Sequence, residues 1–237
     1  MPESEQERES MAKTPYTSAV GCIMYLMVCT RRDIAHAISV VSRFMSNPRK
    51  PYWQALRWIL RYLKGSMDVG LLYQKENNGN GDCVVGYCDA DLESYQDKRK
   101  SLMGYIFSSW GNTISWRALL QPVVALSSTE TEYMAATKET RKAFWLKWLV
   151  NELGVPQNQV IVHCDNQSAI FLAKNQAFSD CTKPIKKKYY FVRELIDKGE
   201  VDLVKIAGEK NLMDMLTKVV PTEKLRLCLS LSNVQSK

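Results

Sequence analysis

Four acidic residues in this chain stand where a mixed sheet gathers polar groups, at strand ends and at the first turns of helices. Asp89 and Asp165 directly follow short apolar strand patterns, whereas Glu132 and Asp214 lie in the opening turns of predicted helices. Divalent cations take several oxygen ligands, and two-metal phosphodiester hydrolysis needs carboxylates from separate chain segments to converge. These residues therefore predict metal-dependent phosphodiester chemistry, provided that the fold brings them together.

Each acid has a structural interpretation when it is taken singly. Asp89 could form a turn at a strand end, and Asp165 could cap the next helix. Glu132 and Asp214 could be first-turn charges that the helix dipole favours. The sequences around the acids, rather than the acids alone, decide between these interpretations.

Asp91 and Glu130 are close neighbours of two of the candidates. Asp91 lies two residues after Asp89 and would point to the same face of a strand. Glu130 would point in a different direction from Glu132 on a helix. We expect Asp91 and Glu130 to lie outside the metal ligands or to face solvent.

The chain after residue 82 alternates between strand and helix patterns, which identifies the elements that would position the acids. Short apolar runs bounded by polar turns predict strands, and longer stretches with apolar residues at helical spacing predict helices. We expect, in chain order, strands at Val84–Cys88, Gly104–Ser109 and Thr113–Trp116, a helix at Thr129–Leu153, a strand at Val160–Cys164, helices at Gln167–Lys174 and Tyr189–Lys198, a strand at Val201–Ile206 and a helix from about Asn211. This order predicts an α/β fold with a mixed five-stranded sheet flanked by helices.

The chain before residue 77 predicts a small helical segment. Apolar residues recur at helical spacing over Tyr16–Cys29, Asp33–Met45 and Tyr52–Lys64. The Gly- and Asn-rich stretch at 77–82 marks a domain boundary. We therefore divide the chain into a disordered polar tail (1–14), a helical segment (15–76), an α/β domain (82–220) and a C-terminal tail (221–237).

Composition favours a globular protein with an anionic partner, because the formal net charge is +7 and 46% of the residues are hydrophobic. Nucleic acid is the partner that we favour. The seven cysteines form no CxxC pair, which indicates reduced thiols. The polar start is unlike a signal peptide, and the apolar run Ala19–Cys29 is too short to span a bilayer. We expect a soluble intracellular protein with no membrane partner.

The segments that contain the acids carry a family resemblance. GYCDAD (86–91), SSTETEYMA (127–135), CDNQSAI (164–170) and NLMDMLTK (211–218) follow one another along the chain. In this order they resemble the ribonuclease H domain of copia-type long-terminal-repeat retrotransposons. The upstream segments YTSAVGCIMYLMVCTRRDIAHAISVVSRFMSNP and WQALRWILRYLKG resemble the C-terminal connection of reverse transcriptase in the same Pol polyproteins.

The resemblance implies a ribonuclease H-like fold that cleaves the RNA strand of an RNA–DNA hybrid. Asp89, Glu132, Asp165 and Asp214 would then be the catalytic metal ligands for two Mg²⁺ ions about 4 Å apart, with Mn²⁺ as an alternative. The position of the glutamate, second rather than last, favours hybrid cleavage over the strand transfer of integrases. The implied setting is reverse transcription beside the polymerase part of a parent polyprotein, in a cytoplasmic virus-like particle or in the nucleus.

Polar and basic residues near the acids are candidates for substrate contacts. Asn166, Gln167 and Ser168 could contact sugar or phosphate, although Asn166 could instead cap a helix. Lys183 and Lys187, in a cluster with Lys186 and Lys188, could bind phosphates or form a solvated loop. The row formed by Arg57, Arg61 and Lys64 is either a solvated helix face or a phosphate-tracking stripe. We assign Trp53, Trp58, Trp145 and Trp148 to the core, and His36 and His163 to structural positions.

Several positions depart from the family pattern. The usual TKHID and the tyrosine–histidine pair after it are replaced by TKPIKKKYY, with Pro184, Lys186 and Tyr190 at the altered places. A histidine that many ribonucleases H carry before the last aspartate is replaced by the segment 208–210. These departures keep open the alternative of a catalytically inactive nucleic-acid-binding remnant. A further alternative is that the connection segment cannot pack without its polymerase and gives an unstable or aggregating product, because its helices would expose apolar faces at 16–64.

Overall fold

The protein is described from a computed structural model over residues 5–74, 84–95, 99–175 and 186–236. The chain divides into two compact units. Unit 1 comprises Met1–Leu72 and Val234–Lys237, and unit 2 comprises Tyr73–Asn233. All four candidate acids belong to unit 2, so each unit is described by itself.

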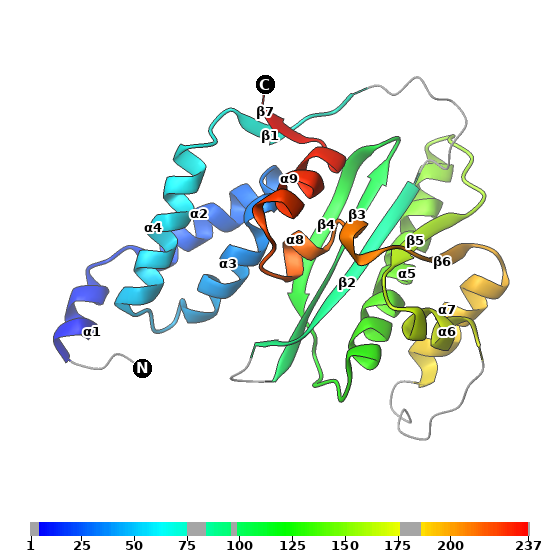
Figure 1. Cartoon of the computed structure of the whole chain (residues 1–237), viewed down its shortest axis with the longest axis horizontal. Helices are drawn as coiled ribbons and strands as arrows, with labels where there is room; N and C mark the ends of the chain where they lie inside the picture. The colour runs from blue at the N-terminus through cyan, green and yellow to red at the C-terminus, as the bar shows by residue number, and fades with distance from the viewer. Residues whose placement is uncertain (1–4, 75–83, 96–98, 176–185, 237) are drawn as a thin grey trace. The chain divides into compact units, whose positions relative to one another are not determined.

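Unit 2 is built on a five-stranded sheet with the strand order β4-β3-β2-β5-β6 (Figure 1). Its strands are β2 (Val84–Tyr95), β3 (Lys100–Ser109), β4 (Asn112–Leu120), β5 (Val160–Cys164) and β6 (Val201–Lys205). The first three strands form an antiparallel meander, and β5 and β6 extend the sheet in parallel from β2. The predicted α/β class with a mixed five-stranded sheet and flanking helices is confirmed.

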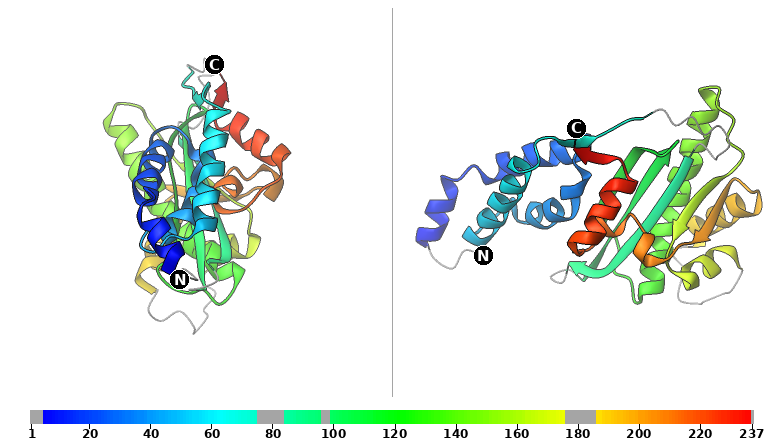
Figure 2. Two further views of the ribbon diagram at one scale, coloured as in Figure 1. Left: turned by 90° about the vertical axis from the view of Figure 1, so that its left-hand side faces the viewer. Right: turned by 45° about the horizontal axis from the view of Figure 1, so that its top comes forward.

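Helices lie on both faces of this sheet, as the two views in Figure 2 show. The helices of unit 2 are α5 (Ser128–Glu152), α6 (Gln167–Lys174), α7 (Lys186–Asp197), α8 (Asp214–Thr217) and α9 (Thr222–Leu231). The long helix α5 packs against the sheet and against α6 and α7. The short helix α8 contacts β2, β3 and β4 from the opposite face. Both faces are therefore covered near the ends of the central strands.

The start of α5 is fixed by local capping. The Ser127 hydroxyl accepts a hydrogen bond from the Glu130 amide at 3.1 Å, and the Glu130 carboxylate accepts one from the Leu126 amide at 2.8 Å. Reciprocal bonds of this kind satisfy amides that a helix N-terminus leaves open. Glu130 thus serves the helix end, and Glu132 begins the buried face of α5.

The core beneath α5 follows strand alternation. Val160, Val162 and Cys164 of β5 are fully buried there, as successive residues on one face of a strand should be. Gly86 of β2 allows the ring of Phe107 to lie against the neighbouring strand, because a Cβ at residue 86 would be 2.4 Å from that ring. The sheet ends that carry the acids are therefore held by a dense apolar layer.

The prediction that the tryptophans belong to the core is wrong for three of them. Trp58, Trp145 and Trp148 are 60%, 46% and 55% exposed, whereas Trp53 packs partly buried in unit 1. Small residues of α5 such as Ala136 and Ala143 fill the buried face instead. Close approach of α5 to the sheet leaves the indole rings of Trp145 and Trp148 outside, which helical spacing alone does not reveal.

Unit 1 is mainly helical. Its elements are α1 (Glu5–Ala12), α2 (Tyr16–Cys29), two 3₁₀ turns (Arg32–Ile34 and Ser42–Phe44) that flank α3 (Ala35–Val41), α4 (Lys50–Lys64), and the antiparallel strands β1 (Val69–Leu71) and β7 (Val234–Ser236). Apolar residues of α2, α3 and α4 form its core. Among the described residues, no helix is both long and apolar enough to cross a membrane.

The ends of the chain differ from the expected tails. Within the predicted tail at 1–14, residues 5–12 form α1, and Met11 is buried. Within the predicted tail at 221–237, residues 222–231 form α9 and residues 234–236 pair with β1. These residues gain structure through contacts with distant segments, which their polar local sequence does not indicate. The contact boundary falls between Leu72 and Tyr73, ahead of the Gly- and Asn-rich stretch.

Candidate metal centre

Two neighbouring parallel strands bring Asp89 and Asp165 to the same edge of the sheet. Tyr87 of β2 pairs with His163 of β5, and each candidate aspartate lies two residues further along the chain, Asp89 within β2 and Asp165 directly after β5. Parallel strands in register deliver equivalent positions side by side. The convergence of these two acids is therefore a direct consequence of the β2–β5 pairing.

Asp214 reaches the same place from α8. Gly104 pairs with Asp89 across β2 and β3, and a Cβ at residue 104 would lie 2.7 Å from the Met213 side chain. The Asn211 amide donates a hydrogen bond to the Cys88 carbonyl at 3.0 Å and fixes the approach of this segment. As a result, ligand atoms of Asp89, Asp165 and Asp214 all lie within 4.8 Å of one another.

Glu132 approaches Asp165 from α5. Its carboxylate, the Cys164 thiol and the Asp165 carboxylate form a second group whose ligand atoms lie within 4.8 Å of one another. Glu132 is only 6% exposed, and within the described residues its Oε2 atom has no hydrogen-bond partner. Asp165 belongs to both groups, so the four acids singled out in the sequence meet around one shared carboxylate.

Basic and hydroxyl groups surround the cluster on the α8 side. Lys218 Nζ lies 2.9 Å from Asp89 Oδ1 and 3.2 Å from Asp214 Oδ1. The Thr217 hydroxyl donates a hydrogen bond to the other oxygen of Asp89. Lys224 Nζ lies 3.5 Å from Asp214 Oδ2 and donates to the carbonyls of residues 208 and 209.

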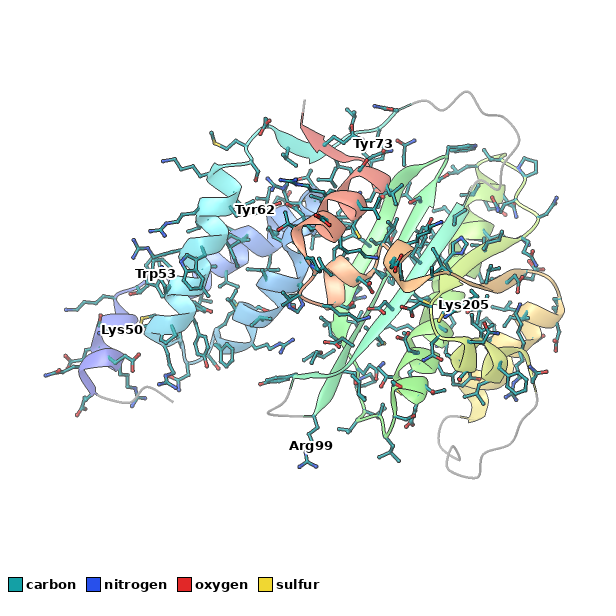
Figure 3. All side chains as sticks on the ribbon, in the orientation of Figure 1. Lys50, Trp53, Tyr62, Tyr73, Arg99 and Lys205 are labelled. Carbon is teal, nitrogen blue, oxygen red and sulfur yellow. The ribbon has the colours of Figure 1, made fainter. Side chains whose placement is uncertain are left out.

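One further lysine contacts the cluster from β6. Lys205, labelled in Figure 3, donates a hydrogen bond to the backbone carbonyl of Asp165. A Cβ at Gly208 would lie 3.5 Å from Asp165 Oδ2, so the turn at 208–210 closes in on the same side chain. Lys205 therefore holds the backbone of Asp165, and the turn at 208–210 lies close to its side chain.

Burial is the largest influence on the pKa values of Asp89 and Glu132. Burial raises the pKa of Asp89, and Asp214 adds to this, while Lys218 and Thr217 oppose it. Burial, followed by the charge of Asp89, raises the pKa of Glu132 to about 10. Burial lowers the pKa of Lys218, but Asp89 and Asp214 outweigh it, so the pKa of this lysine rises. Such like-charge crowding is typical of a site that binds a cation.

The donor set fits hard divalent cations. Mg²⁺ and Mn²⁺ prefer carboxylate oxygens, and the unpartnered Oε2 of buried Glu132 is an oxygen that a cation would satisfy. Cys164, Thr217 and Lys218 are the neighbours that the sequence did not single out. Lys218 follows Asp214 by four residues, the spacing of facing side chains on a helix, and that signal could have identified it.

Those residues predicted to contact substrate that the structure describes lie in different structural environments. Asn166 caps α6, because its Oδ1 accepts a hydrogen bond from the Ala169 amide at 2.9 Å. Gln167 and Ser168 are exposed in the first turn of α6, directly after Asp165. Lys183 and Pro184 lie outside the described residues. So do the side chains at 186–190, although the backbone there forms the start of α7.

The two rival acids are placed outside both ligand groups. Asp91 continues β2 and is partly buried, two residues beyond Asp89. Glu130 is occupied at the N-terminus of α5 by the capping bond to Leu126. Neither belongs to the groups of potential ligands found among the described residues.

Comparison with known sequences finds transposon polyproteins. The chain is 47% identical over 235 residues to the retrovirus-related Pol polyprotein from transposon TNT 1-94 of Nicotiana tabacum, covering 99% of this chain and 17% of that protein. It is 34% identical over 206 residues to the corresponding polyprotein from transposon RE2 of Arabidopsis thaliana, covering 86% of this chain and 14% of that protein. The chain thus spans less than a fifth of the polyproteins that it matches.

The chain is also similar to a shorter protein and to a solved structure. The chain is 47% identical over 136 residues to secreted RxLR effector protein 161 of Plasmopara viticola, covering 57% of this chain and 94% of that protein. A ribonuclease H1, LC11-RNase H1, solved in complex with RNA/DNA hybrid, aligns with 54% of this chain and 88% of its own at 14% identity and a TM-score of 0.41. No protein-family model matches the chain.

Proposed function

Because this chain belongs to the retrovirus-related Pol polyproteins of copia-type transposons, we propose that unit 2 is a ribonuclease H that hydrolyses the RNA strand of RNA–DNA hybrids with two divalent metal ions. Unit 1 then corresponds to the C-terminal connection of the reverse transcriptase, predicted at 15–76. The partner of the whole chain is the polymerase part of its parent polyprotein, in a cytoplasmic virus-like particle or in the nucleus.

The observation that carries the proposal is the sharing of Asp165 between two groups of potential ligands. Hydrolysis by two metal ions needs a pair of cations close enough to act on one phosphate, and a shared carboxylate keeps two sites adjacent. Asp89, Asp165 and Asp214 would hold one ion, and Glu132 together with Asp165 would hold the other. Bound there, divalent ions would supply a lowered pKa for an attacking water molecule and charge stabilisation for the leaving 3′ oxygen.

The residues of the chain itself prepare this site. Thr217 orients Asp89 through its hydroxyl, and the Asn211 bond to the Cys88 carbonyl holds the α8 segment against β2. Such fixed geometry places ligands without reorganisation during the reaction. The exposed Gln167 and Ser168 stand beside Asp165, where they could contact phosphate or a 2′-hydroxyl group.

Recognition of the hybrid would depend on shape and backbone rather than on base sequence. RNA-containing helices are read largely through phosphates and 2′-hydroxyl groups, so we expect sequence-tolerant cleavage. The net charge of +7 favours such a polyanion. The basic cluster that contains Lys183 and Lys187 remains a candidate for these phosphate contacts.

A labelled RNA–DNA hybrid tests the proposal. Wild-type protein with Mg²⁺ or Mn²⁺ should cut the RNA strand, and chelation with EDTA should stop it. Asp89→Asn should abolish cleavage while it leaves the shape of the ligand set unchanged. Equal cleavage by wild type and Asp89→Asn would mean a contaminating nuclease and would remove the support for this site.

The second candidate function is a catalytically inactive hybrid-binding remnant. Lys218 pairs with both Asp89 and Asp214, and such a partly compensated site could persist in a protein that only binds nucleic acid. Hybrid binding without cleavage at any Mg²⁺ or Mn²⁺ concentration would favour this alternative. Metal-dependent cleavage that Asp89→Asn removes would exclude it.

A further inference from the structure

Lys218 occupies the position between two acids that a metal ion would need. Its ammonium group lies 2.9 Å from Asp89 Oδ1 and 3.2 Å from Asp214 Oδ1, and both acids belong to one group of potential metal ligands. The second oxygen of Asp89 accepts a hydrogen bond from Thr217. Both oxygens of Asp89 are therefore already engaged, and the side chain of that residue is fully buried.

The other side of the cluster is different. Glu132 Oε2 has no hydrogen-bond partner among the described residues, and Lys205 contacts Asp165 only through its backbone carbonyl. Positive charge is thus concentrated on the Asp89–Asp214 side of Asp165. Among the described residues no ammonium group pairs with Glu132, whereas an ion on the Asp89–Asp214 side would have to displace the ammonium group of Lys218.

Lys218 is more exposed than Lys224 and makes fewer contacts with backbone carbonyls. The Lys218 side chain is 35% exposed and follows the last residue of the four-residue helix α8. Lys224, whose side chain is 14% exposed, is tied to the carbonyls of residues 208 and 209 as well as facing Asp214. Loss of Asp89 and Asp214 as partners would leave Lys218 free to turn toward solvent.

We propose that Lys218 is a built-in counter-ion that a divalent metal ion must displace from Asp89 and Asp214. The inference rests on the proposed metal site of unit 2, but it does not depend on cleavage. Lys218 stabilises the metal-free site by pairing with two crowded carboxylates. It also competes with the incoming ion, so it raises the metal concentration at which the Asp89–Asp214 side fills.

Calorimetric titration of Mg²⁺ and Mn²⁺ into the full chain tests the competition. Lys218→Met keeps the aliphatic length of the side chain but removes its charge. This variant should bind the ion on the Asp89–Asp214 side about 10- to 100-fold more tightly than wild type, the range that charge-assisted hydrogen bonds contribute to an equilibrium constant. Lys218→Arg, which keeps the charge, should bind the ion with affinity close to that of wild type. Lys224→Met is the matched control and should change the affinity less, because Lys224 does not bridge the two acids.

Lysine reactivity in the wild-type chain provides a test without any variant. Amine acylation read by mass spectrometry should find Lys218 protected in EDTA and more reactive once Mg²⁺ is added. Lys198, which pairs with Glu194 on the surface, is the internal reference and should not change. Asp214→Asn should raise the reactivity of Lys218 in EDTA, since it removes one of the two partners.

The outcomes separate this inference from the proposed nuclease activity. Unchanged or weaker metal binding by Lys218→Met, or Mg²⁺-independent reactivity of Lys218, would overturn the displacement while cleavage could still be present. Metal binding that appears only in Lys218→Met would support the displacement even if wild type cuts no hybrid. If neither protein binds either ion, the displacement is wrong, and the metal part of the proposed function is wrong with it.

Discussion

The two units contain buried ionic networks that differ in how completely they are satisfied. In unit 1, the Arg31 guanidinium donates to both oxygens of Asp33 at 3.0 and 3.2 Å, and also to the carbonyl and hydroxyl oxygens of Ser66 at 2.8 and 2.7 Å. Tyr62, labelled on α4 in Figure 3, donates to Asp33 at 2.8 Å. In unit 2, three other acids crowd around Asp165, and an oxygen of Glu132 has no partner among the described residues.

This difference separates a structural network from a candidate site. The charges of Arg31 and Asp33 are matched one to one, and burial followed by Asp33 raises the pKa of Tyr62 to about 12, so its hydroxyl stays a donor. Buried charges are tolerated when pairing and hydrogen bonds are complete. In unit 2, by contrast, four acids face two paired lysines, Lys218 and Lys224, and burial followed by the charge of Asp89 raises the pKa of Glu132 to about 10.

The largest expected effect comes from the acid that both ligand groups share. Asp165→Asn should lower hybrid cleavage by at least about 1000-fold, because bound metal ions supply several kcal/mol of transition-state stabilisation. The Lys205 contact uses the backbone of residue 165 and should survive, so unfolding in EDTA should change little. Asp202→Asn is the control, since Asp202 pairs with Lys174 elsewhere on the sheet. If both variants cleave equally, the two-group site is not the catalytic site.

The complementary change in unit 1 should affect stability and not cleavage chemistry. Asp33→Asn leaves Arg31 buried with its charge unmatched, and breaking a buried pair in this way costs about 3 kcal/mol. Hydrogen exchange of the α2–α4 amides should show this loss of protection. Glu9→Gln on the exposed face of α1 should show none. Unchanged protection in Asp33→Asn would mean that the network contributes specificity rather than stability.

Metal addition should distinguish the two networks within one experiment. At a concentration of 100 times the Kd, a bound ion stabilises the folded state by about 2.7 kcal/mol. Hydrogen exchange should show that Mg²⁺ slows exchange of the β2 and β5 amides and leaves the α2–α4 amides unchanged. Equal protection of both sets of amides would contradict a site confined to the acids of unit 2.

Glu139 tests whether a buried, unsatisfied acid is enough to make a site. It is fully buried on α5, its oxygens have no hydrogen-bond partner within the described chain, and burial raises its pKa well above the usual 4.5 despite Lys138, Arg117 and Lys142. The folded protein keeps this proton while the unfolded chain loses it, so stability falls as pH rises above about 4.5.

Replacing Glu139 by an uncharged residue should abolish the decrease of folding stability with rising pH that this acid causes. The stability advantage of Glu139→Gln over wild type should grow by about 1.4 kcal/mol per pH unit from about pH 5 upward. Urea unfolding across pH measures it, and Glu152→Gln, at an exposed position of the same helix, is the control. Parallel pH profiles for Glu139→Gln and wild type would show that Glu139 is charged when folded. Metal affinity should not change, because convergence of several acids, rather than burial of one, makes the site.

Local patterns in the sequence determined the class of the fold and the elements that carry the acids. The strand predicted at 160–164 is β5 within the same bounds, and the helix predicted at 129–153 is α5 shifted by one residue. Strand alternation and helical spacing depend on residues within one element, so they can be read along the chain. The family resemblance likewise identified Asp89, Glu132, Asp165 and Asp214 from short segments.

Only the tertiary structure decided which groups surround these acids. The extension of β2 to Tyr95 comes from pairing with β3, and the ordering of residues 222–236 comes from contacts with segments far away in the chain. The bridge from Lys218 to Asp89 joins residues 129 positions apart, and the contact of Cys164 with Glu132 joins a strand to a helix. Such contacts are set by how elements pack, and packing is a property of the whole chain that no local spacing contains.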